Sequence, residues 1–256
     1  MAPNPIALNI FGFDIRWYGI LIAVGMLLAI LILYKRAPRH EINPEKMIDL
    51  ILIVIPLGII GARLYYVFSN WSFYQGDFMK IIDIRAGGLA FHGGIIVGVL
   101  ASVLLCFIWR IRPLNLLDLA MPAVALAQSI GRWGNYFNQE AYGIPTNLPW
   151  AINVNGVMVH PTFLYESIWC LLLFLLLSFI DSRRTFEGQV FLLYGILYSF
   201  ERFFVEWLRI DSLMIGEYRI AQVVSLIIFV TFTIAYIIRS YKASSKNSMF
   251  INRRYL

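Results

Sequence analysis

Residues 17–34 have the sequence WYGILIAVGMLLAILILY, an uninterrupted stretch of 18 residues without a charged side chain. The basic residues Lys35 and Arg36 follow it directly. A helix needs about 20 predominantly apolar residues to cross the hydrocarbon core of a bilayer. This stretch therefore predicts a membrane-spanning helix, anchored at its end by positive charge.

The rest of the chain has the same character. Of its 256 residues, 60% are hydrophobic and 14% are charged, whereas a soluble domain has about a quarter charged residues. Apolar runs between charged or Pro/Gly breaks predict an all-α polytopic membrane protein with about seven spans. The expected spans are 17–34, 48–68, 89–109, 115–133, 162–180, 187–207 and 220–238.

The distribution of lysine and arginine predicts the orientation. Most of the 21 basic residues follow the first, third and fifth spans or lie in the C-terminal tail. Cytoplasmic loops of membrane proteins carry this excess, so we expect the N-terminus outside and the C-terminus in the cytoplasm. The basic residues on this side are Lys35, Arg36, Arg39, Lys46, Arg110, Arg112, Arg183, Arg184, Arg239, Lys242, Lys246, Arg253 and Arg254.

We expect one membrane-embedded domain over residues 1–256, with two extramembrane parts. A polar stretch at about 135–161 predicts a small extracytoplasmic cap, and residues 239–256 predict a basic cytoplasmic tail. Within the cap, Asn155-Gly156 lies between short apolar runs. Asn-Gly favours a tight hairpin turn, so a hairpin is expected at Val154–Val159.

Four arginines, Arg63, Arg132, Arg202 and Arg209, lie within or beside predicted spans on the outer side. An arginine at the bilayer centre costs at least about 2.5 kcal/mol and usually faces a polar cavity or a partner. Arginines recur on several helices at one depth. This pattern indicates that their side chains converge on an anion.

The stretch GRWGNYFNQE, residues 131–140, is the most polar motif near a span end. Arg132, Asn135 and Asn138 recur every third residue and share an edge if the helix continues. The planar guanidinium suits phosphate, and the asparagine side chains suit ester or hydroxyl oxygens. The alternative is a helix C-terminus with an arginine that extends to the interface.

A second polar stripe lies near the end of the sixth span. Tyr198, Arg202, Glu206 and Arg209 project within an arc of roughly 80° on a helix, so that each side chain could bond the next. The stripe predicts either a binding surface or an internally neutralised ion-pair ladder that joins helices.

Histidines supply candidate proton-transfer groups. His92, flanked by glycines in AFHGG, could take a proton from a thiol, although a lone helical histidine is often structural. His160 to Glu166 are expected to be mainly structural, where the chain re-enters the membrane. Because His92 and His160 lack metal-site spacing, no metal is expected. Cys106 and Cys170 lie inside apolar runs and are expected to be buried and inert.

The motifs GRWGNYFNQEAYG, RWYGILIAVG, GARLYYV, AFHGG, HPTFLYES and YSFERFFVEWLR together resemble the prolipoprotein diacylglyceryl transferase family. They follow the order of that family, Gln222 also fits, and the resemblance covers nearly the whole chain. Ser199 departs from the glycine that often follows the motif tyrosine, and Glu201 is an unusually charged neighbour of Arg202. These differences bear on the packing of that helix.

The resemblance implies a bacterial enzyme of the cytoplasmic membrane, inner or sole, with seven helices and its site open to the outer leaflet. The donor would be phosphatidylglycerol and the acceptor the lipobox cysteine of a preprolipoprotein. Products would be a thioether and glycerol phosphate, and no cofactor is implied. The residues that match the functional positions of the family are Tyr18, His92, Arg132, Asn135, Glu140, Tyr198, Arg202, Glu206 and Arg209.

The expected roles follow from the chemistry of these side chains. Arg132 and Arg202 would hold the lipid phosphate, His92 would take the thiol proton, and Glu206 would orient Arg202. Asn135 and Glu140 would position the glycerol head group or the peptide. The alternatives are a lipid or anion transporter, against which the absence of repeat symmetry argues, and a structural membrane scaffold.

Overall fold

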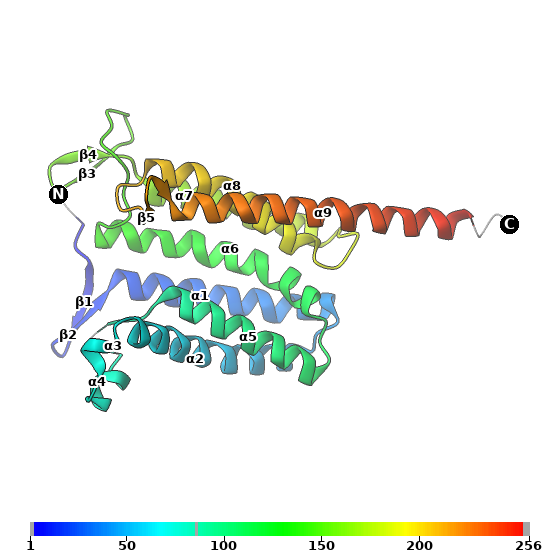
Figure 1. Ribbon diagram of the computed structural model, residues 1–256, viewed down its shortest axis with the longest axis horizontal. Coiled ribbons are helices and arrows are strands. Elements are labelled where there is room, and N and C mark those ends of the chain that lie inside the picture. Colours follow the sequence, from blue (N-terminus) through cyan, green and yellow to red (C-terminus); the bar gives the residue numbers. More distant parts are fainter. Residues whose placement is uncertain (1–2, 85–86, 253–256) are drawn as a thin grey trace. The chain divides into compact units, whose positions relative to one another are not determined.

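The computed structural model describes residues 3–84 and 87–252, with the backbone alone for Phe91 and residues 246–252. Arg253 and Arg254 of the predicted basic tail lie outside the described residues. The elements in chain order (Figure 1) are β1 Ile6–Ile10, β2 Phe13–Arg16, α1 Trp17–Arg36, the 3-10 helix η1 Ala37–His40, α2 Pro44–Ser69, α3 Trp71–Tyr74, α4 Phe78–Ile82, α5 Phe91–Trp109, α6 Pro113–Asn138, β3 Ile152–Val154, β4 Val157–Val159, α7 Thr162–Asp181, α8 Gln189–Leu208, β5 Met214–Ile215, β6 Tyr218–Arg219 and α9 Ile220–Asn252.

Each predicted span corresponds to a helix. Within the described residues, six helices are long and apolar enough to cross a membrane. The seventh, α8, has 20 residues but carries several charged side chains, including Glu201, Arg202 and Glu206. The all-α polytopic fold is therefore confirmed, with six to seven candidate spanning helices. The orientation and the single-domain organisation stay predictions.

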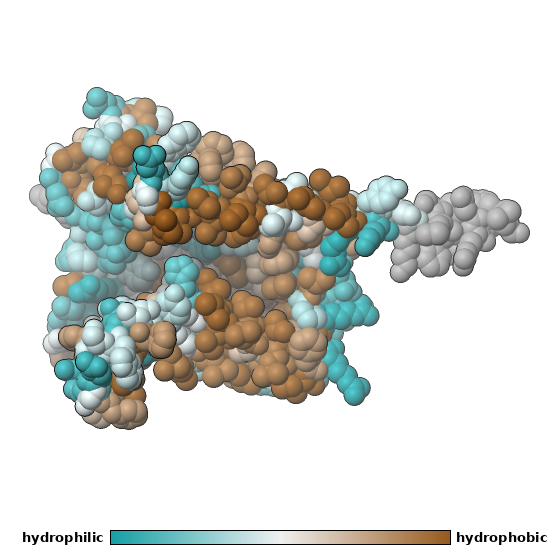
Figure 2. Space-filling model, in the orientation of Figure 1, coloured by the Kyte–Doolittle hydropathy of each residue, from teal (hydrophilic) through white to brown (hydrophobic). Residues whose placement is uncertain are grey.

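The chain divides into two compact units, which are described separately. The first unit comprises Met1–Ile32 and Leu117–Leu256, and the second comprises Leu33–Leu116. Figure 2 shows hydrophobic side chains along α9 in the first unit and along the α2–α5 face of the second. Apolar surface of this extent matches a lipid solvent rather than water.

In the second unit, α2 and α5 lie side by side (Figure 1) and pack through glycines. A Cβ atom on Gly61 would lie 2.8 Å from the carbonyl oxygen of Gly93 and would also collide with Val97. The hydrophobic effect does not drive helices together in a membrane, because lipid tails are as apolar as the side chains. Van der Waals contact at close backbone approach therefore stabilises their packing. The small residues therefore determine how these helices pack.

Arg63 fastens α2 to α4 and to two glycines that follow α4. Its side chain is 94% buried, being 6% exposed, and its guanidinium lies 5.1 Å from the Tyr74 ring centroid. The nitrogens donate to the backbone carbonyl oxygens of Lys80, Ile81, Gly87 and Gly88, at 2.6 to 2.9 Å. Since its donors are occupied by backbone, the expectation that Arg63 helps to hold an anion is wrong.

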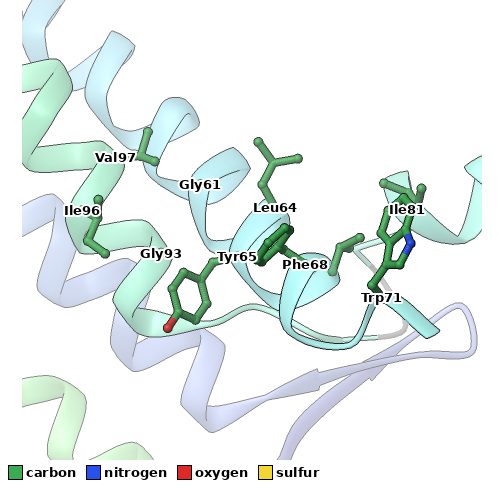
Figure 3. A pocket seen from close by; sticks show the side chains of 10 residues that line it. Gly61, Leu64, Tyr65, Phe68, Trp71, Ile81, Gly93, Ile96 and Val97 are labelled. Atoms are coloured by element: carbon green, nitrogen blue, oxygen red, sulfur yellow. The ribbon is translucent and has the colours of Figure 1, made fainter. Parts of the chain in front are cut away.

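An apolar groove opens beside Arg63 in the second unit, with a volume of about 450 Å³. Figure 3 shows Leu64, Tyr65 and Phe68 of α2 beside Ile96 and Val97 of α5, with Trp71 and Ile81 towards one end. The lining is almost entirely hydrocarbon, as expected of a surface exposed to acyl chains.

In the first unit, α8 packs against both α7 and α9. Asp118 of α6, fully buried, accepts hydrogen bonds from the backbone nitrogens of Gly188 at 2.7 Å and Phe191 at 2.9 Å. Gly188 is the residue that precedes α8 and Phe191 is in its first turn, where backbone nitrogens have no intrahelical partners. Asp118 therefore fixes the start of α8 against α6.

Serines join α6 to the first turns of α7. The Ser129 hydroxyl donates to the Ser167 carbonyl oxygen at 2.8 Å, and the Ser167 hydroxyl donates to the Ser129 carbonyl oxygen at 2.8 Å. Polar contacts of this kind hold helices together where lipid is the solvent. Below them, Ala125, Leu173, Leu177 and Val190 form a buried apolar core.

The segments that precede or join the helices of the first unit contain short hairpins. The predicted hairpin is confirmed: β3 pairs with β4 around Asn155-Gly156, both with positive φ. The β1–β2 and β5–β6 hairpins were not predicted. The helix α6 continues to Asn138, which confirms that Arg132, Asn135 and Asn138 lie on one helix.

Gly61→Ala tests the glycine packing of the second unit. We expect overpacking to lower the stability by about 1–3 kcal/mol, because the new methyl has no space between α2 and α5. Thermal unfolding in detergent measures the loss. Gly98→Ala is the matched control, since its Cβ would meet only Val54 Cγ1 at 3.8 Å, and it should be neutral or stabilising. Equal melting temperatures for the two variants would contradict this packing.

Candidate active site

The site is organised by Glu166 in the first turns of α7. Its side chain is 1% exposed. One carboxylate oxygen, Oε2, lies 3.1 Å from Arg132 Nη1 of α6. The other, Oε1, accepts a hydrogen bond from Arg202 Nη1 of α8 at 3.0 Å. A single buried carboxylate therefore holds guanidinium groups from two other helices.

Further side chains orient the two arginines. Arg202 Nη2 lies 2.5 Å from Glu206 Oε2, one turn along α8. Arg132 Nη2 donates to the Tyr198 hydroxyl at 3.3 Å. The contacts to Glu166 Oε2 and Glu206 Oε2 are close ion pairs whose angles fall short of hydrogen bonds. The expected link between Arg202 and Glu206 is thus confirmed, whereas Tyr198 bonds Arg132 and not Arg202.

The two guanidinium groups are partly accessible while their counter-ions are not. The exposed side-chain fractions are 20% for Arg132 and 18% for Arg202, against 1% for Glu166 and 3% for Glu206. A guanidinium has five N–H donors. Each arginine uses only two of its three nitrogens within the described residues, so donors remain for an incoming anion.

Residues at the end of α6 form a polar edge beside Arg132. The Asn135 amide donates to Glu140 Oε1 at 3.0 Å, and the Asn138 amide donates to the same oxygen at 3.3 Å. Tyr18 of α1 packs its ring against Gly134, where a Cβ would lie 3.0 Å from Tyr18 Cε2. Asn135, Glu140 and Tyr18 are therefore on the same unit as the arginines, as the motif predicted.

The loop after α6 is tied to both α7 and α8. The backbone nitrogen of Gly143 donates to the His160 carbonyl oxygen at 2.9 Å, and that of Ile144 donates to the Leu208 carbonyl oxygen at 2.7 Å. A Cβ on Gly143 would meet His160 Cβ at 2.7 Å, so glycine is required for this approach. The loop thereby fixes Glu140 relative to the helices that carry the arginines.

Arg209 points to a different partner from the one expected. It makes a bidentate contact with Asp211, Nε to Oδ1 at 2.9 Å and Nη2 to Oδ2 at 2.7 Å. These hydrogen bonds lower the pKa of the Asp211 carboxyl from its ordinary value. Within the described residues no bond joins the side chains of Glu206 and Arg209. The Glu206 carbonyl oxygen accepts from the Arg209 backbone nitrogen at 3.2 Å and from the Arg219 side chain.

The histidines have separate places. His160 Nδ1 lies 3.2 Å from the Tyr165 hydroxyl. That hydroxyl accepts from Trp150 Nε1 at 2.8 Å. A structural role for His160 stays a prediction. His92 belongs to the second unit, at the start of α5. The arginines of the site belong to the first unit, and the participation of His92 in that site stays a prediction.

The two sequence departures on α8 are both buried. Ser199 is 3% exposed and Glu201 is 7% exposed. Neither carboxylate oxygen of Glu201 has a hydrogen-bond partner within the described residues. Both cysteines are also buried, as expected.

Sequence reasoning missed the central role of Glu166, because HPTFLYE was interpreted as mainly structural. A usable signal was present. Glu166 is the only charged residue between Thr162 and Ile180, and a carboxylate inside a spanning helix normally faces a cationic partner. What the sequence could not reveal is that two arginines share it.

The arrangement defines a class of protein. It is a polytopic membrane protein whose first unit presents two oriented, partly exposed guanidinium groups, which suit bidentate binding of a phosphate. Among the described residues there is no cluster of three or more His, Cys, Asp or Glu side chains that could hold a metal ion. Anion binding is what the two guanidinium groups can perform.

Comparison with known proteins then gives the family. The chain matches the model of the prolipoprotein diacylglyceryl transferase family over residues 5–238, and it belongs to this family. It is 50% identical over 226 residues to the phosphatidylglycerol–prolipoprotein diacylglyceryl transferase of Finegoldia magna, covering 88% of this chain and 91% of the relative. The Clostridioides difficile protein of the same name is 48% identical over 244 residues, with 95% and 98% coverage.

Glu166→Gln tests the centre of the site. Loss of the negative charge leaves two arginines facing each other without their common counter-ion, and breaking a buried pair from one side costs about 3–5 kcal/mol. We expect a large fall in melting temperature in detergent. Asp77→Asn is the control, because Asp77 pairs with Lys80 on the exposed α3–α4 segment at 3.5 Å. A Glu166→Gln protein as stable as the control would show that the shared contact is unimportant.

Proposed function

We propose that this protein transfers the sn-1,2-diacylglyceryl group of phosphatidylglycerol to the lipobox cysteine thiol of preprolipoproteins. This is the first step of bacterial lipoprotein maturation. The relatives carry this activity in their names and align over most of both chains. The single observation that carries the proposal within the structure is the pair of arginines from α6 and α8 on one buried carboxylate.

The reaction is a displacement at the C3 carbon of the diacylglyceryl group. The thiol loses its proton, the sulfur forms a bond to C3, and the bond from C3 to the phosphate oxygen breaks. Glycerol phosphate leaves with the electron pair of that bond, so its phosphate gains a second negative charge. Donors already aimed at the phosphate stabilise this developing charge without reorganisation.

The roles of individual residues follow from their contacts. Arg132 and Arg202 hold the phosphate with the donors that Glu166, Tyr198 and Glu206 leave free. Glu166 and Glu206 are positioning residues, since they fix the planes of the guanidinium groups. The resemblance to the family implies a catalytic set of His92, Arg202, Tyr198 and Glu206. Within this set, Tyr198 and Glu206 would act by positioning Arg132 and Arg202, while Arg202 and His92 would meet the reacting groups.

The remaining predicted residues bind the substrate around the phosphate. Asn135 and Glu140 form the edge that would meet the glycerol hydroxyls, and Tyr18 closes that edge against Gly134. Arg209, held by Asp211, adds positive charge at the end of α8. Together they would bind the head group, while the acyl chains stay in the bilayer.

The protein is a multi-pass membrane protein of a bacterial family. We infer that its site faces the extracytoplasmic side of the cytoplasmic membrane. The excess of lysine and arginine in the loops at the other end of the helices supports this orientation. The preprolipoprotein would present its cysteine there, at the membrane surface.

An assay with purified protein, labelled phosphatidylglycerol and a lipobox peptide tests the function. We expect a lipid-shifted peptide and released glycerol phosphate. Arg202→Lys should lower kcat by about a hundredfold, since lysine is a point charge without the planar fork. Arg183→Lys is the matched control, because Arg183 lies over the Phe179 ring, 4.0 Å from its centroid, away from the site.

Two outcomes would contradict this proposal. Undiminished transfer by Arg202→Lys would exclude bidentate phosphate holding. Flipping of lipid without modification of the peptide would favour the alternative of a lipid or anion transporter.

His92→Gln tests the proton acceptor. A free thiol has a pKa of about 8.5 and histidine about 6.5, so a base matters most near neutral pH. We expect transfer by His92→Gln to fall strongly at pH 7 and to recover partly at pH 9, where the thiolate forms without help. His160→Gln serves as the control, since its ring contacts Tyr165. Near-normal transfer by His92→Gln at pH 7 would remove His92 from the mechanism.

A further inference from the structure

A second polar pair lies one helical turn deeper than Arg132 and Tyr198. Gln128 precedes Arg132 by four residues on α6, and Tyr194 precedes Tyr198 by four residues on α8. The Tyr194 hydroxyl donates to Gln128 Oε1 at 2.8 Å. The rings of Tyr194 and Tyr198 are stacked, with centroids 5.5 Å apart and an interplanar angle of 9°. Both pairs therefore join α6 to α8, one helical turn apart.

Gln128 and Tyr194 lie farther than the arginines from the loop that joins the C-terminal ends of α6 and α8. The C-terminal ends of α6 and α8 meet at the loop around Gly143, as the bond from Ile144 to Leu208 shows. Four residues towards the N-terminal ends of both helices correspond to about 6 Å along the axis. Gln128 and Tyr194 are thus deeper in the span than the arginines, and both are only partly buried.

The pair has a hydrogen-bond donor to spare. Gln128 Oε1 accepts from Tyr194 and has Cys170 Sγ at 4.0 Å, which orients the amide with its NH₂ group away from both. That NH₂ group makes no hydrogen bond within the described residues. If the amide were reversed, the Tyr194 hydroxyl would become the spare donor, because the pair has three N–H and O–H donors and uses one. A donor without a partner at this depth is costly unless a ligand supplies an acceptor.

The chemistry of the substrate supplies such an acceptor. In phosphatidylglycerol the head-group glycerol is outermost and the phosphate follows, and the ester carbonyl oxygens lie one further glycerol unit deeper. With the phosphate bound to Arg132 and Arg202, an ester carbonyl oxygen would lie at the depth of Gln128 and Tyr194. Carbonyl oxygens are the only strong acceptors in that part of the lipid, since the chains beyond are hydrocarbon.

We propose that Gln128, positioned by Tyr194, binds an ester carbonyl of the donor lipid and makes the enzyme selective for ester-linked over ether-linked phosphatidylglycerol. The inference rests on the proposed function and deepens it, because it names a specificity-determining residue of the same site. The contact is present before and during the reaction. It therefore acts on KM for the lipid and leaves kcat largely unchanged.

The test compares diacyl and dialkyl phosphatidylglycerol of equal chain length in the peptide-lipidation assay. A dialkyl lipid keeps the phosphate and the reacting carbon but has no carbonyl oxygen. We expect the wild-type protein to use the diacyl lipid with a KM roughly three- to tenfold lower, the size of one net hydrogen bond. Gln128→Met keeps the length of the side chain without a donor, and should have equal KM values for both lipids.

Two further variants separate this contact from a general loss of packing. Tyr194→Phe removes the hydroxyl that orients the Gln128 amide. We expect this variant to keep only part of the preference for the diacyl lipid. Gln189→Met is the matched control: Gln189 also pairs with a tyrosine, Tyr236, with Nε2 and the hydroxyl 3.3 Å apart, but at the opposite end of α8. It should keep the wild-type preference for the ester lipid.

The outcomes are distinguishable. Wild-type protein that uses both lipids with equal KM overturns this inference alone, as does Gln128→Met that keeps the wild-type preference. Wild-type protein that lipidates the peptide from neither lipid overturns the proposed function and the inference together.

Discussion

The structure of the first unit depends on the burial of one carboxylate. Glu166 lies in the first turns of an otherwise apolar helix, and a carboxylate there is unfavourable unless cations meet it. Arg132 and Arg202 fulfil that need from two different helices. The same contact stabilises the arginines, because a guanidinium group within a spanning helix is also unfavourable without a partner. Each of α6, α7 and α8 is therefore constrained by the charge requirement of the others.

Around this contact, the chain uses close approach and backbone hydrogen bonds to hold the helices. Asp118 fixes the start of α8, the serine pair joins α6 to α7, and the loop at Gly143 ties the opposite ends together. These contacts leave the two guanidinium groups oriented and partly exposed. A site built in this way is organised before any lipid arrives, which is the condition for electrostatic stabilisation of a departing phosphate.

Much of this could be predicted from the sequence, for definite physical reasons. The spans could be predicted because only a bilayer requires apolar runs of about 20 residues. The turn at Asn155-Gly156 could be predicted from the backbone preferences of these two residues. The motif around Arg132 indicated phosphate because few other ligands need that side chain beside asparagines. Such features are local, so neighbouring residues alone determine them.

The choice of partner for each charge could not be predicted, because it depends on tertiary contacts. Arg63 and Arg209, like Arg132, lie within or beside predicted spans, yet Arg63 binds backbone carbonyls and Arg209 binds Asp211. Glu166 is central for the opposite reason, since its partners lie 34 and 36 residues away along the chain. The β1–β2 hairpin was missed because Phe11-Gly12 is a weaker turn signal than Asn-Gly.

The most direct test of the shared-carboxylate account is a solid-state NMR measurement in lipid bilayers. Protein labelled with nitrogen-15 at arginine side chains would be combined with phosphatidylglycerol, and the dipolar coupling between phosphorus and guanidinium nitrogen recorded. The account predicts coupling at hydrogen-bonding distance that involves both Arg132 and Arg202 and that disappears in the Glu166→Gln protein. Phosphorus coupled to neither guanidinium, or coupling unchanged without the Glu166 charge, would contradict it.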